Sequence, residues 1–337
     1  MTHVKPALPP APNAAIVASS PSSQPMLDIS KCRACGGDYG RRFELNSYHY
    51  GICRNCKSIL KILSQDQYNA LDPTYDPGAF IENLSDENWR EHLHIDEYKG
   101  HLAPIIPKLS ERHPKQTLKL LDIGCGMGGF LLAAKESGLE AYGVEPSESH
   151  SLIGRTRFGL NIRSAYFSRD DYRDAEFDIV VLWHVIEHIF DQSAFLKDVY
   201  SVLRPGGIVL IATPNAGSTV ATLTGTNWSM LRPVDHVGML TPQAFSYIAP
   251  AGSSVSVNTG EYLWEPFVSL TGATRNMIVR ALAPNSGPPG GYRDTVSRIN
   301  DNKILRATAI MLSAPIFVFD KAFSRASCIM CKIEKPI

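Results

Sequence analysis

The sequence lacks three features that would indicate a membrane-spanning, exported or strongly charged protein. No run of about 18 apolar residues occurs, so no ordinary membrane-spanning helix is predicted. The first residues have neither the charged nor the apolar region of a secretory signal. Lysine and arginine number 33, and so do aspartate and glutamate, so no net charge attracts nucleic acid or an anionic membrane to the whole molecule.

A disulfide framework is not expected either. The seven cysteines are an odd number, and a chain without a secretory signal is predicted to lie in the reducing cytosol. The 337 residues suffice for one domain of ordinary size and a small module, and 44% hydrophobic with 20% charged residues is typical of a folded protein. We therefore expect a cytoplasmic protein with reduced cysteines.

The composition divides the chain into four parts. Residues 1–29 are rich in proline, alanine and serine, and are predicted to be a disordered tail because little apolar surface offsets the entropy of ordering. Residues 30–60 contain four cysteines, and residues 61–115 have the polar helical spacing of a connecting segment. Over residues 116–337, apolar runs alternate with helical stretches as in βαβ units, with a helical insertion at about 260–325.

Two cysteine pairs near the N-terminus have the spacing of a zinc site. Each Cys-x-x-Cys turn presents two thiolates to one ion, and two such turns complete a tetrahedron around Zn²⁺. Four cysteines leave no open coordination position, so we expect a structural ion that stabilises a zinc ribbon too small to fold on its own core. The predicted ligands are Cys32, Cys35, Cys53 and Cys56.

A glycine-rich segment follows the first predicted strand of the large domain. The apolar run at 120–123 is followed by Gly-Cys-Gly-Met-Gly-Gly at 124–129, and glycines allow a sharp turn from strand to helix and the close approach of a ligand. A second strand at 141–144 leads to Glu145, near the position where nucleotide-binding folds place an acid for ribose hydroxyls. Spacing alone does not separate a nicotinamide-dinucleotide fold from other nucleotide-binding folds.

Four motifs together resemble the class I S-adenosylmethionine-dependent methyltransferases. They are LLDIGCGMGGF at 120–130, YGVEPS at 142–147, FDIVVLWHVIEHI at 177–189 and LRPGGIVLIATPN at 203–215. The resemblance covers roughly residues 115–260 and implies an α/β fold, with a doubly wound, Rossmann-like sheet of seven strands that ends in an antiparallel hairpin. The zinc ribbon would precede this sheet, and residues 328–334 would be its last strand. S-adenosyl-L-methionine is the implied cofactor.

The resemblance also assigns cofactor-binding roles by position. The glycines would pass close to the methionine and ribose parts of the cofactor, Asp122 would brace their loop, and Glu145 would accept hydrogen bonds from both ribose hydroxyls. Asp171 falls near the adenine side, where a solvated loop charge is the alternative. The remaining candidates are the three glycines Gly124, Gly126 and Gly128, and Trp183 and His184 at the end of the fourth strand.

The segment from His184 to His188 directly follows the fourth strand, at the edge where open α/β sheets bind ligands. It is similar to the Glu-x-x-Glu-His motif of quinone-pathway O-methyltransferases, in which the acids and the histidine are tied to a divalent metal. Because His184 replaces the first glutamate and Mg²⁺ prefers oxygen ligands, a magnesium site is doubtful. Glu187 and His188 are predicted catalytic residues, with His188 as a general base. Structural bracing by both is the alternative.

A second candidate base lies after the fifth strand. Trp228, Arg232 and His236 form a cluster that is typical of a substrate pocket over the sheet, and His236 either contacts substrate or makes a structural hydrogen bond. Thr241 is expected to be the N-cap of a helix that begins at Pro242.

The main hypothesis is methyl transfer to a small-molecule acceptor, namely a hydroxyl of a sugar, a glycan or a natural-product intermediate. It rests on analogy with zinc-ribbon methyltransferases of polysaccharide and natural-product pathways. One alternative is a nucleotide-sugar C-methyltransferase, although that family normally adds a second large domain. A cofactor-dead interaction platform is another.

An RNA methyltransferase that uses the ribbon as a reader is a further alternative. The ribbon carries six basic residues, which are often only solvated charges, so nucleic acid is not the expected partner: Lys31, Arg33, Arg41, Arg42, Arg54 and Lys57. Residues 304–319 are apolar almost all round and are expected to form a buried helix. Peripheral membrane contact with a lipid-linked glycan is the alternative for this stretch.

Overall fold

The computed structural model describes residues 29–69, 89–114, 116–232, 235–260, 269–271 and 325–337, and parts of 307–320. The expected tail, part of the connecting segment and most of the insertion therefore lie outside the described residues. The described residues of the apolar stretch 304–319 are helical, but Met311, Leu312 and Val318 are exposed, so the expected buried helix is wrong for this part of the stretch. Within the described part, no helix has the length and apolar character needed to cross a membrane.

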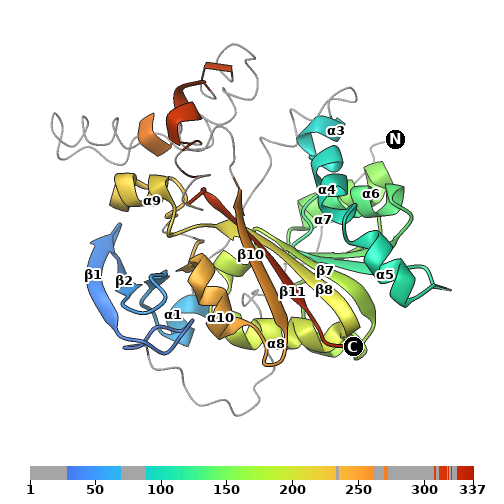
Figure 1. Cartoon of the computed structure of the whole chain (residues 1–337), viewed down its shortest axis with the longest axis horizontal. Coiled ribbons are helices and arrows are strands. Elements are labelled where there is room, and N and C mark those ends of the chain that lie inside the picture. The colour runs from blue at the N-terminus through green and yellow to red at the C-terminus, as the bar shows by residue number, and fades with distance from the viewer. Residues whose placement is uncertain are drawn as a thin grey trace, which may run out of the picture.

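A seven-stranded sheet forms the centre of the molecule, with the strand order β10-β11-β8-β7-β4-β5-β6 (Figure 1). Neighbouring strands from β8 to β6 are parallel, whereas β11 is antiparallel to both β8 and β10. The predicted doubly wound sheet with an antiparallel final hairpin is thus confirmed. The strands are β4 (Lys119–Ile123), β5 (Glu140–Glu145), β6 (Ile162–Ser164), β7 (Phe177–Trp183), β8 (Leu203–Pro214), β10 (Ser254–Gly260) and β11 (Cys328–Glu334).

Helices cover both faces of this sheet. The helices of the described residues are α1 (Gln65–Asn69), α3 (Trp89–His92), α4 (Ile95–Leu102), α5 (Ile106–Arg112), α6 (Gly129–Glu136), α7 (Glu148–Phe158), α8 (Gln192–Val202), α9 (Thr219–Thr224) and α10 (Phe245–Ile248). Short 3-10 turns are η1 (Arg169–Asp171), η2 (Ile186–His188), η3 (Gly225–Asn227) and η4 (Pro242–Ala244).

The central strands are apolar on both sides because each side packs on helices. Val180 and Leu182 of β7 belong to the same buried cluster as the apolar residues of α8. Ile179 and Val181, which alternate with them, belong to a second cluster with residues of α4 and α6. This alternation is the reason why β7 reads as an unbroken apolar run in the sequence.

The ribbon strands form a second sheet, and part of the large domain completes it. Its order is β1-β2-β3-β9, and β9 lies in the sequence between β8 and β10 of the large sheet. Ile59 of β3 pairs with Met239 of β9, and the two strands are antiparallel. The four-cysteine region and the chain beside His236 therefore share one sheet. The strands are β1 (Tyr39–Leu45), β2 (Tyr48–Cys53), β3 (Ile59–Lys61) and β9 (Gly238–Met239).

The expected helix cap at Thr241 is wrong. Thr241 precedes η4, but its side chain makes no cap hydrogen bond there. Its hydroxyl instead donates to the carbonyl oxygen of Cys56, and its own N–H lies 3.3 Å from the hydroxyl oxygen of Ser58. The polar side chain therefore joins the large domain to the ribbon.

Candidate functional site

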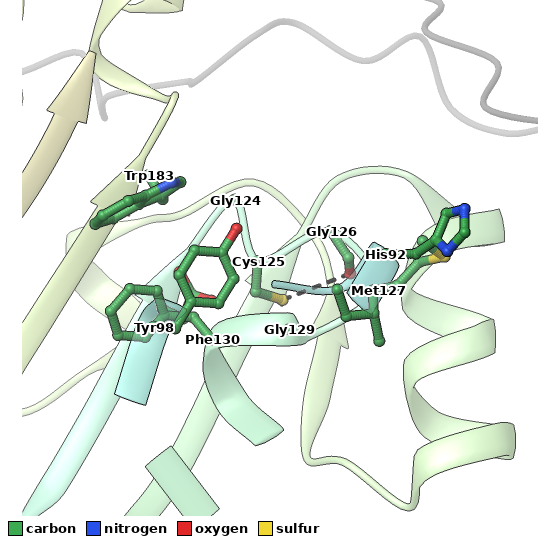
Figure 2. Close-up of a pocket in the computed structure, with 11 residues that line it drawn as sticks. His92, Tyr98, Gly124, Cys125, Gly126, Met127, Gly129, Phe130 and Trp183 are labelled. Atoms are coloured by element: carbon green, nitrogen blue, oxygen red, sulfur yellow. Dashed lines mark hydrogen bonds between the residues drawn. The ribbon is translucent and has the colours of Figure 1, made fainter. Parts of the chain in front are cut away.

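A cavity of about 180 Å³ opens where β4 and β7 end (Figure 2). The glycine loop after β4 forms one wall. Aromatic rings form another, with Tyr98 stacked 4.7 Å from Phe130, and Phe130 5.3 Å from Trp183 between ring centroids. His92 at the end of α3 and Leu93 after it also line the cavity. The cavity therefore lies at the carboxyl edge of the sheet, as predicted.

The glycines of the loop have different tasks. Gly124 and Gly126 line the cavity and have φ values of 71° and 53°, which side-chain-bearing residues rarely adopt. A Cβ at Gly126 would meet nothing within 4 Å, so the backbone is open to a ligand there. Gly128 does not line the cavity: a Cβ there would meet Leu160 at 2.3 Å, so this position is needed for packing. Gly129, which the motif analysis did not single out, lines the cavity instead.

Glu145 holds the glycine loop from the end of β5. Its Oε2 accepts a hydrogen bond of 2.9 Å from the N–H of Gly126, and its Oε1 accepts one of 2.8 Å from Ser147. Burial raises the pKa of this carboxyl, while the two backbone donors oppose the rise. The resemblance implied that Asp122 braces this loop; the hydrogen bond to the N–H of Gly126 comes from Glu145, and the role of Asp122 stays a prediction.

Asp122 is buried in the cavity wall, and one of its carboxylate oxygens lacks a hydrogen-bond donor in the described part of the chain. Its side chain lines the cavity and is 2% exposed, and its Oδ1 accepts no hydrogen bond within the part of the chain that the structure describes. Burial, followed by the nearby Glu145 carboxylate, raises the pKa of Asp122 well above its ordinary value. A buried carboxylate oxygen without a donor is costly, and a ligand with a cationic donor would relieve that cost.

Glu187 lies fully buried in η2, immediately beyond β7. Its Oε1 is 3.1 Å from Nδ1 of His184, and its Oε2 accepts a hydrogen bond of 2.9 Å from the hydroxyl of Thr213 on β8. Burial alone would raise the pKa of this carboxyl, but the hydrogen bond from His184 and the charges of the nearby histidines lower it to about 2. The carboxylate is therefore ionised at neutral pH.

The two predicted base histidines lie together beside Glu187. The rings of His188 and His236 are 4.8 Å apart between centroids. One ligand atom of each histidine and a carboxylate oxygen of Glu187 all lie within 4.8 Å of one another. Burial lowers the pKa of His236 to about 3, so this ring is neutral at physiological pH. The structure thus brings together the three residues that the sequence analysis named as catalytic.

Of three other predicted cofactor residues, one lines the cavity and two do not. Trp183 lines the cavity as expected. His184 does not line it; its φ of 57° turns the chain after β7 and directs its ring to Glu187. Asp171 of η1 forms an ion pair of 2.5 Å with Arg163 and does not line the cavity either. The adenine-side role of Asp171 stays a prediction.

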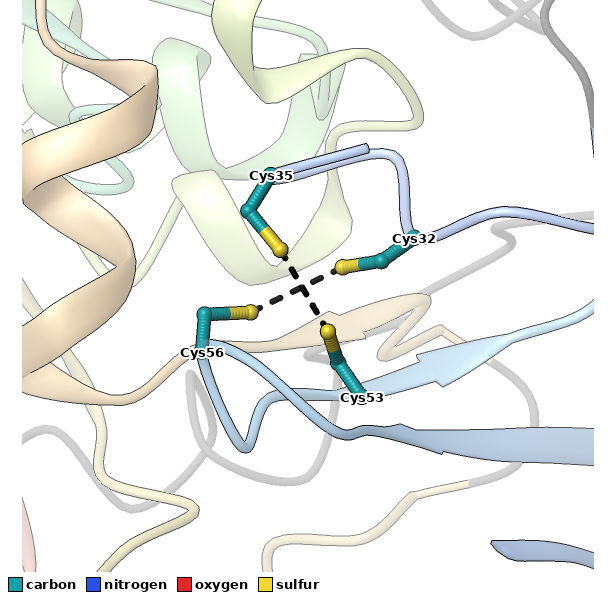
Figure 3. A group of neighbouring side chains, drawn as sticks. All are labelled: Cys32, Cys35, Cys53 and Cys56. Carbon is teal, nitrogen blue, oxygen red and sulfur yellow. Dashed lines mark hydrogen bonds between the residues drawn. The ribbon is translucent and has the colours of Figure 1, made fainter. Parts of the chain in front are cut away.

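The four ribbon cysteines converge on one point (Figure 3). The sulfur atoms of Cys32 and Cys56 are 3.6 Å apart, and those of Cys35 and Cys53 are 3.3 Å apart. A tetrahedral ion with Zn–S bonds of about 2.3 Å places its sulfurs about 3.8 Å from one another. The cluster therefore has the size and the donor type of a zinc site.

Arg33, between the first two cysteines, is a functional residue that the sequence analysis missed. Its guanidinium donates to three carbonyl oxygens, those of Phe190 at 3.0 Å, Lys61 at 2.8 Å and Val237 at 3.3 Å. It also lies 4.3 Å from the ring centroid of Phe190. The side chain is buried, so Arg33 is not one of the solvated charges that an RNA-binding ribbon would use. It connects the ribbon to the segments next to His188 and His236.

Comparison with known proteins also indicates a methyltransferase domain. The model of a protein family described as a methyltransferase domain matches residues 51–249. A ubiquinone biosynthesis O-methyltransferase from Bradyrhizobium sp. (strain ORS 278) is 29% identical over 179 residues, which cover 45% of this chain and 68% of the relative. An ajmaline N-methyltransferase from Rauvolfia serpentina is 28% identical over 172 residues, which cover 43% of this chain and 58% of the relative.

Many of the matches span less of the relative. A ubiquinone biosynthesis O-methyltransferase from Sinorhizobium medicae (strain WSM419) is 34% identical over 117 residues, which cover 33% of this chain and 47% of the relative. The chain thus spans about half the length of several of the curated relatives it matches. Among solved structures, an S-adenosylmethionine-dependent methyltransferase from Archaeoglobus fulgidus superposes with a TM-score of 0.42 at 17% identity, over 73% of this chain and 98% of that one.

Proposed function

The chain belongs to the methyltransferase-domain family and is an S-adenosylmethionine-dependent methyltransferase, and from this premise we propose that it methylates a hydroxyl of a small molecule. The proposed acceptor is a sugar, a glycan or a natural-product intermediate. The observation that supports a hydroxyl is the Glu187–His188–His236 cluster, in which Glu187 and His188 follow Trp183 of the cavity wall by a few residues. A hydroxyl must lose its proton as it attacks, whereas a neutral amine already presents a lone pair.

The cavity fits S-adenosylmethionine on the evidence of its own residues. The Oδ1 of Asp122, which has no donor in the described part of the chain, suits the ammonium group of the methionine part, and the bare backbone at Gly126 leaves room for a ligand. Glu145 does not itself line the cavity, but it holds Gly126, which does. We assign the ribose hydroxyls to Glu145, since each of its oxygens keeps a further lone pair. When bound, the sulfonium of the cofactor supplies an electrophilic methyl group.

The four-cysteine cluster is proposed to hold a structural Zn²⁺. Its four sulfurs occupy the full tetrahedron, so no position is left for a substrate. Because β9 belongs to the ribbon sheet and Arg33 reaches the carbonyl of Val237, the ion also supports the position of His236.

His188 is the proposed proton acceptor. Its ring is half-buried, so an acceptor molecule has access to it, whereas the fully buried His236 resists protonation. The Glu187 carboxylate would stabilise the imidazolium that forms. The indole of Trp183 and the ring of Phe130 would exclude water from the cavity side.

Labelled methyl transfer tests the proposal. The protein is incubated with methyl-labelled S-adenosylmethionine and panels of hydroxyl compounds (nucleotide sugars, oligosaccharides and phenols), amines and carbon acids. We expect label in a hydroxyl compound, with turnover reduced about 100-fold or more by His188→Ala. Cofactor affinity should be unchanged in that variant, and the exposed His49→Ala serves as the matched control. Label only in amines or in carbon acids would refute the hydroxyl proposal.

A further inference from the structure

We propose that Gln192 is a positioning residue for the two histidines His188 and His236. It lies in the first turn of α8, and its side chain is 1% exposed. Its amide nitrogen Nε2 donates to the carbonyl oxygen of Ile186 at 3.1 Å and to that of Gly238 at 3.1 Å. One side chain therefore joins the segment that carries His188 to the segment that carries His236.

The two neighbours of the Gln192 amide decide which of its atoms faces them. A carbonyl oxygen only accepts a hydrogen bond, so the amide nitrogen, which carries two hydrogens, must face both carbonyls. The amide oxygen has no donor within the part of the chain that the structure describes. An apolar side chain at this position would avoid the cost of that buried oxygen, but it would not bind the two carbonyls.

The partner strand leaves space for this amide. A Cβ at Gly238 would lie 2.2 Å from Nε2 of Gln192 and 3.2 Å from the side chain of Leu60. Because those distances are too short for a side chain, glycine is needed at position 238 for the amide to reach the carbonyl. The contact is thus accommodated from both segments.

Two further hydrogen bonds join the same segments. The N–H of Val237 donates to the carbonyl oxygen of Glu187 at 2.9 Å, and Nδ1 of His188 lies 3.0 Å from the carbonyl oxygen of Asp235. Since that carbonyl only accepts, Nδ1 of His188 carries the proton and its Nε2 keeps a lone pair. Gln192 closes the same junction from α8, and so fixes the spacing at which this tautomer is held.

The helix α8 ties the junction to the central sheet. Its apolar residues belong to the same buried cluster as Val180 and Leu182 of β7. By contrast, β9, which follows His236, has only two residues. A side chain that begins on α8 and reaches β9 therefore sets the position of His236 relative to the sheet.

This tie matters for proton transfer, and the step rests on the proposed function. A base must lie within hydrogen-bonding distance of the acceptor hydroxyl and present its lone pair to it. Without the Gln192 amide, the carbonyl of Asp235 is no longer fixed beside His188, so the ring is not held in one orientation. A displacement of about 1 Å in a reacting group can reduce turnover about 100-fold.

Nuclear magnetic resonance of the full-length protein tests the positioning role without an acceptor. Long-range proton–nitrogen spectra of protein with isotope-labelled histidine report which ring nitrogen carries the proton, and His188→Ala identifies the signal of His188. We expect the Nδ1–H form of His188 in the wild-type protein and in the exposed control Gln243→Met. We expect a mixture of both tautomers in Gln192→Met, which keeps the length of the side chain and removes both donors.

The Nε2–H form of His188 in the wild-type protein would overturn the proposal, and this result does not depend on the folding of any variant. An unchanged tautomer in folded Gln192→Met would overturn it as well, because a side chain that only stabilises the fold leaves the ring of the folded protein unaffected. Gly238→Ala displaces the same amide from the other segment and should give the same mixture, so it replaces Gln192→Met if that variant does not fold.

Turnover supplies a second readout. With a hydroxyl acceptor from the labelling experiment, Gln192→Met should lower kcat about tenfold or more, while KM for S-adenosylmethionine changes less than about twofold. An unchanged kcat would overturn the positioning role. A failure of the hydroxyl proposal would appear in the labelling experiment and would leave the tautomers unchanged.

Discussion

The junction between the ribbon and the large sheet differs from the cofactor cavity in how it treats buried charge. At the junction, the buried guanidinium of Arg33 donates to three carbonyl oxygens of the chain itself. In the cavity wall, the buried carboxylate of Asp122 keeps an oxygen that accepts no hydrogen bond in the described part of the chain. The buried charge at the junction therefore has its hydrogen-bond partners without a ligand, whereas the buried oxygen in the cavity wall would gain a partner only from a ligand.

This difference separates stability from binding. A group whose partners all lie within the chain lowers the free energy of the folded state, and its removal leaves those partners unpaired. A group that waits for a ligand raises the free energy of the unliganded fold, and its removal relieves that cost at the expense of affinity. The Glu187 carboxylate belongs to the first kind, since both of its oxygens have partners within the chain.

Loss of a ribbon thiolate is the largest expected effect. Cys56→Ser should remove the zinc of the ribbon and unfold it, because a module of this size depends on metal binding worth on the order of 10 kcal/mol. The effect should spread to β9, which pairs with β3 and follows His236. Zinc content and thermal unfolding measure both. Cys328→Ser, on β11 and outside the cluster, is the control that should keep the ribbon ion. A folded Cys56→Ser ribbon would contradict the proposed structural zinc.

Removal of the Arg33 guanidinium is the next largest effect. Arg33→Met should lower the free energy of unfolding by about 3 kcal/mol, because three hydrogen bonds to buried carbonyls are lost at once, although the carbonyl of Val237 keeps the N–H of Lys61 as a donor. Urea denaturation at pH 7 measures the loss. The exposed Arg41 of β1 gives the matched control, and Arg41→Met should change stability by less than about 0.5 kcal/mol. Equal effects of the two variants would show that the junction does not depend on Arg33.

The sequence predicted those parts of the molecule that depend on neighbours in the chain. The cysteine pairs and the glycine loop are local patterns, and the apolar runs together with the four motifs predicted the seven-stranded sheet. The pattern of the second predicted strand placed Glu145 at the end of that strand, where it lies. The motif also predicted that Glu187 and His188 would lie at the carboxyl edge of the sheet.

The remainder depends on contacts between distant segments. Arg33 looked like a solvated charge because its partners are 157 and 204 residues away, at Phe190 and Val237. The meeting of His188 with His236 requires that β9 join the ribbon sheet, and a two-residue strand has no sequence signal. Gly129 lines the cavity in place of Gly128, which packs against Leu160 from a distant part of the sequence, a contact that the motif does not specify.

The smallest effect should have the opposite sign, and it tests the comparison most directly. Asp122→Asn removes the open charge and keeps the shape, so the unliganded protein should gain about 1 kcal/mol at pH 7 while its affinity for S-adenosylmethionine falls about tenfold or more. Asp178, on the adjacent strand β7, is equally buried but accepts hydrogen bonds from Arg204 at 2.8 Å and from the N–H of Lys119 at 2.8 Å. Asp178→Asn should therefore destabilise the protein.

The pH dependence gives the same test a second readout. The folded-state pKa of Asp122 is raised, so the folded protein binds its proton more readily than the unfolded chain does, and the wild-type protein loses stability as the pH rises from about 4 through that raised value. Asp122→Asn lacks this loss, so its advantage over the wild-type protein should grow with pH. Urea denaturation between pH 5 and pH 8, with calorimetric titration of the cofactor, measures both quantities. Destabilisation by Asp122→Asn, or an advantage that shrinks as the pH rises, would show that Asp122 is satisfied within the chain as Asp178 is.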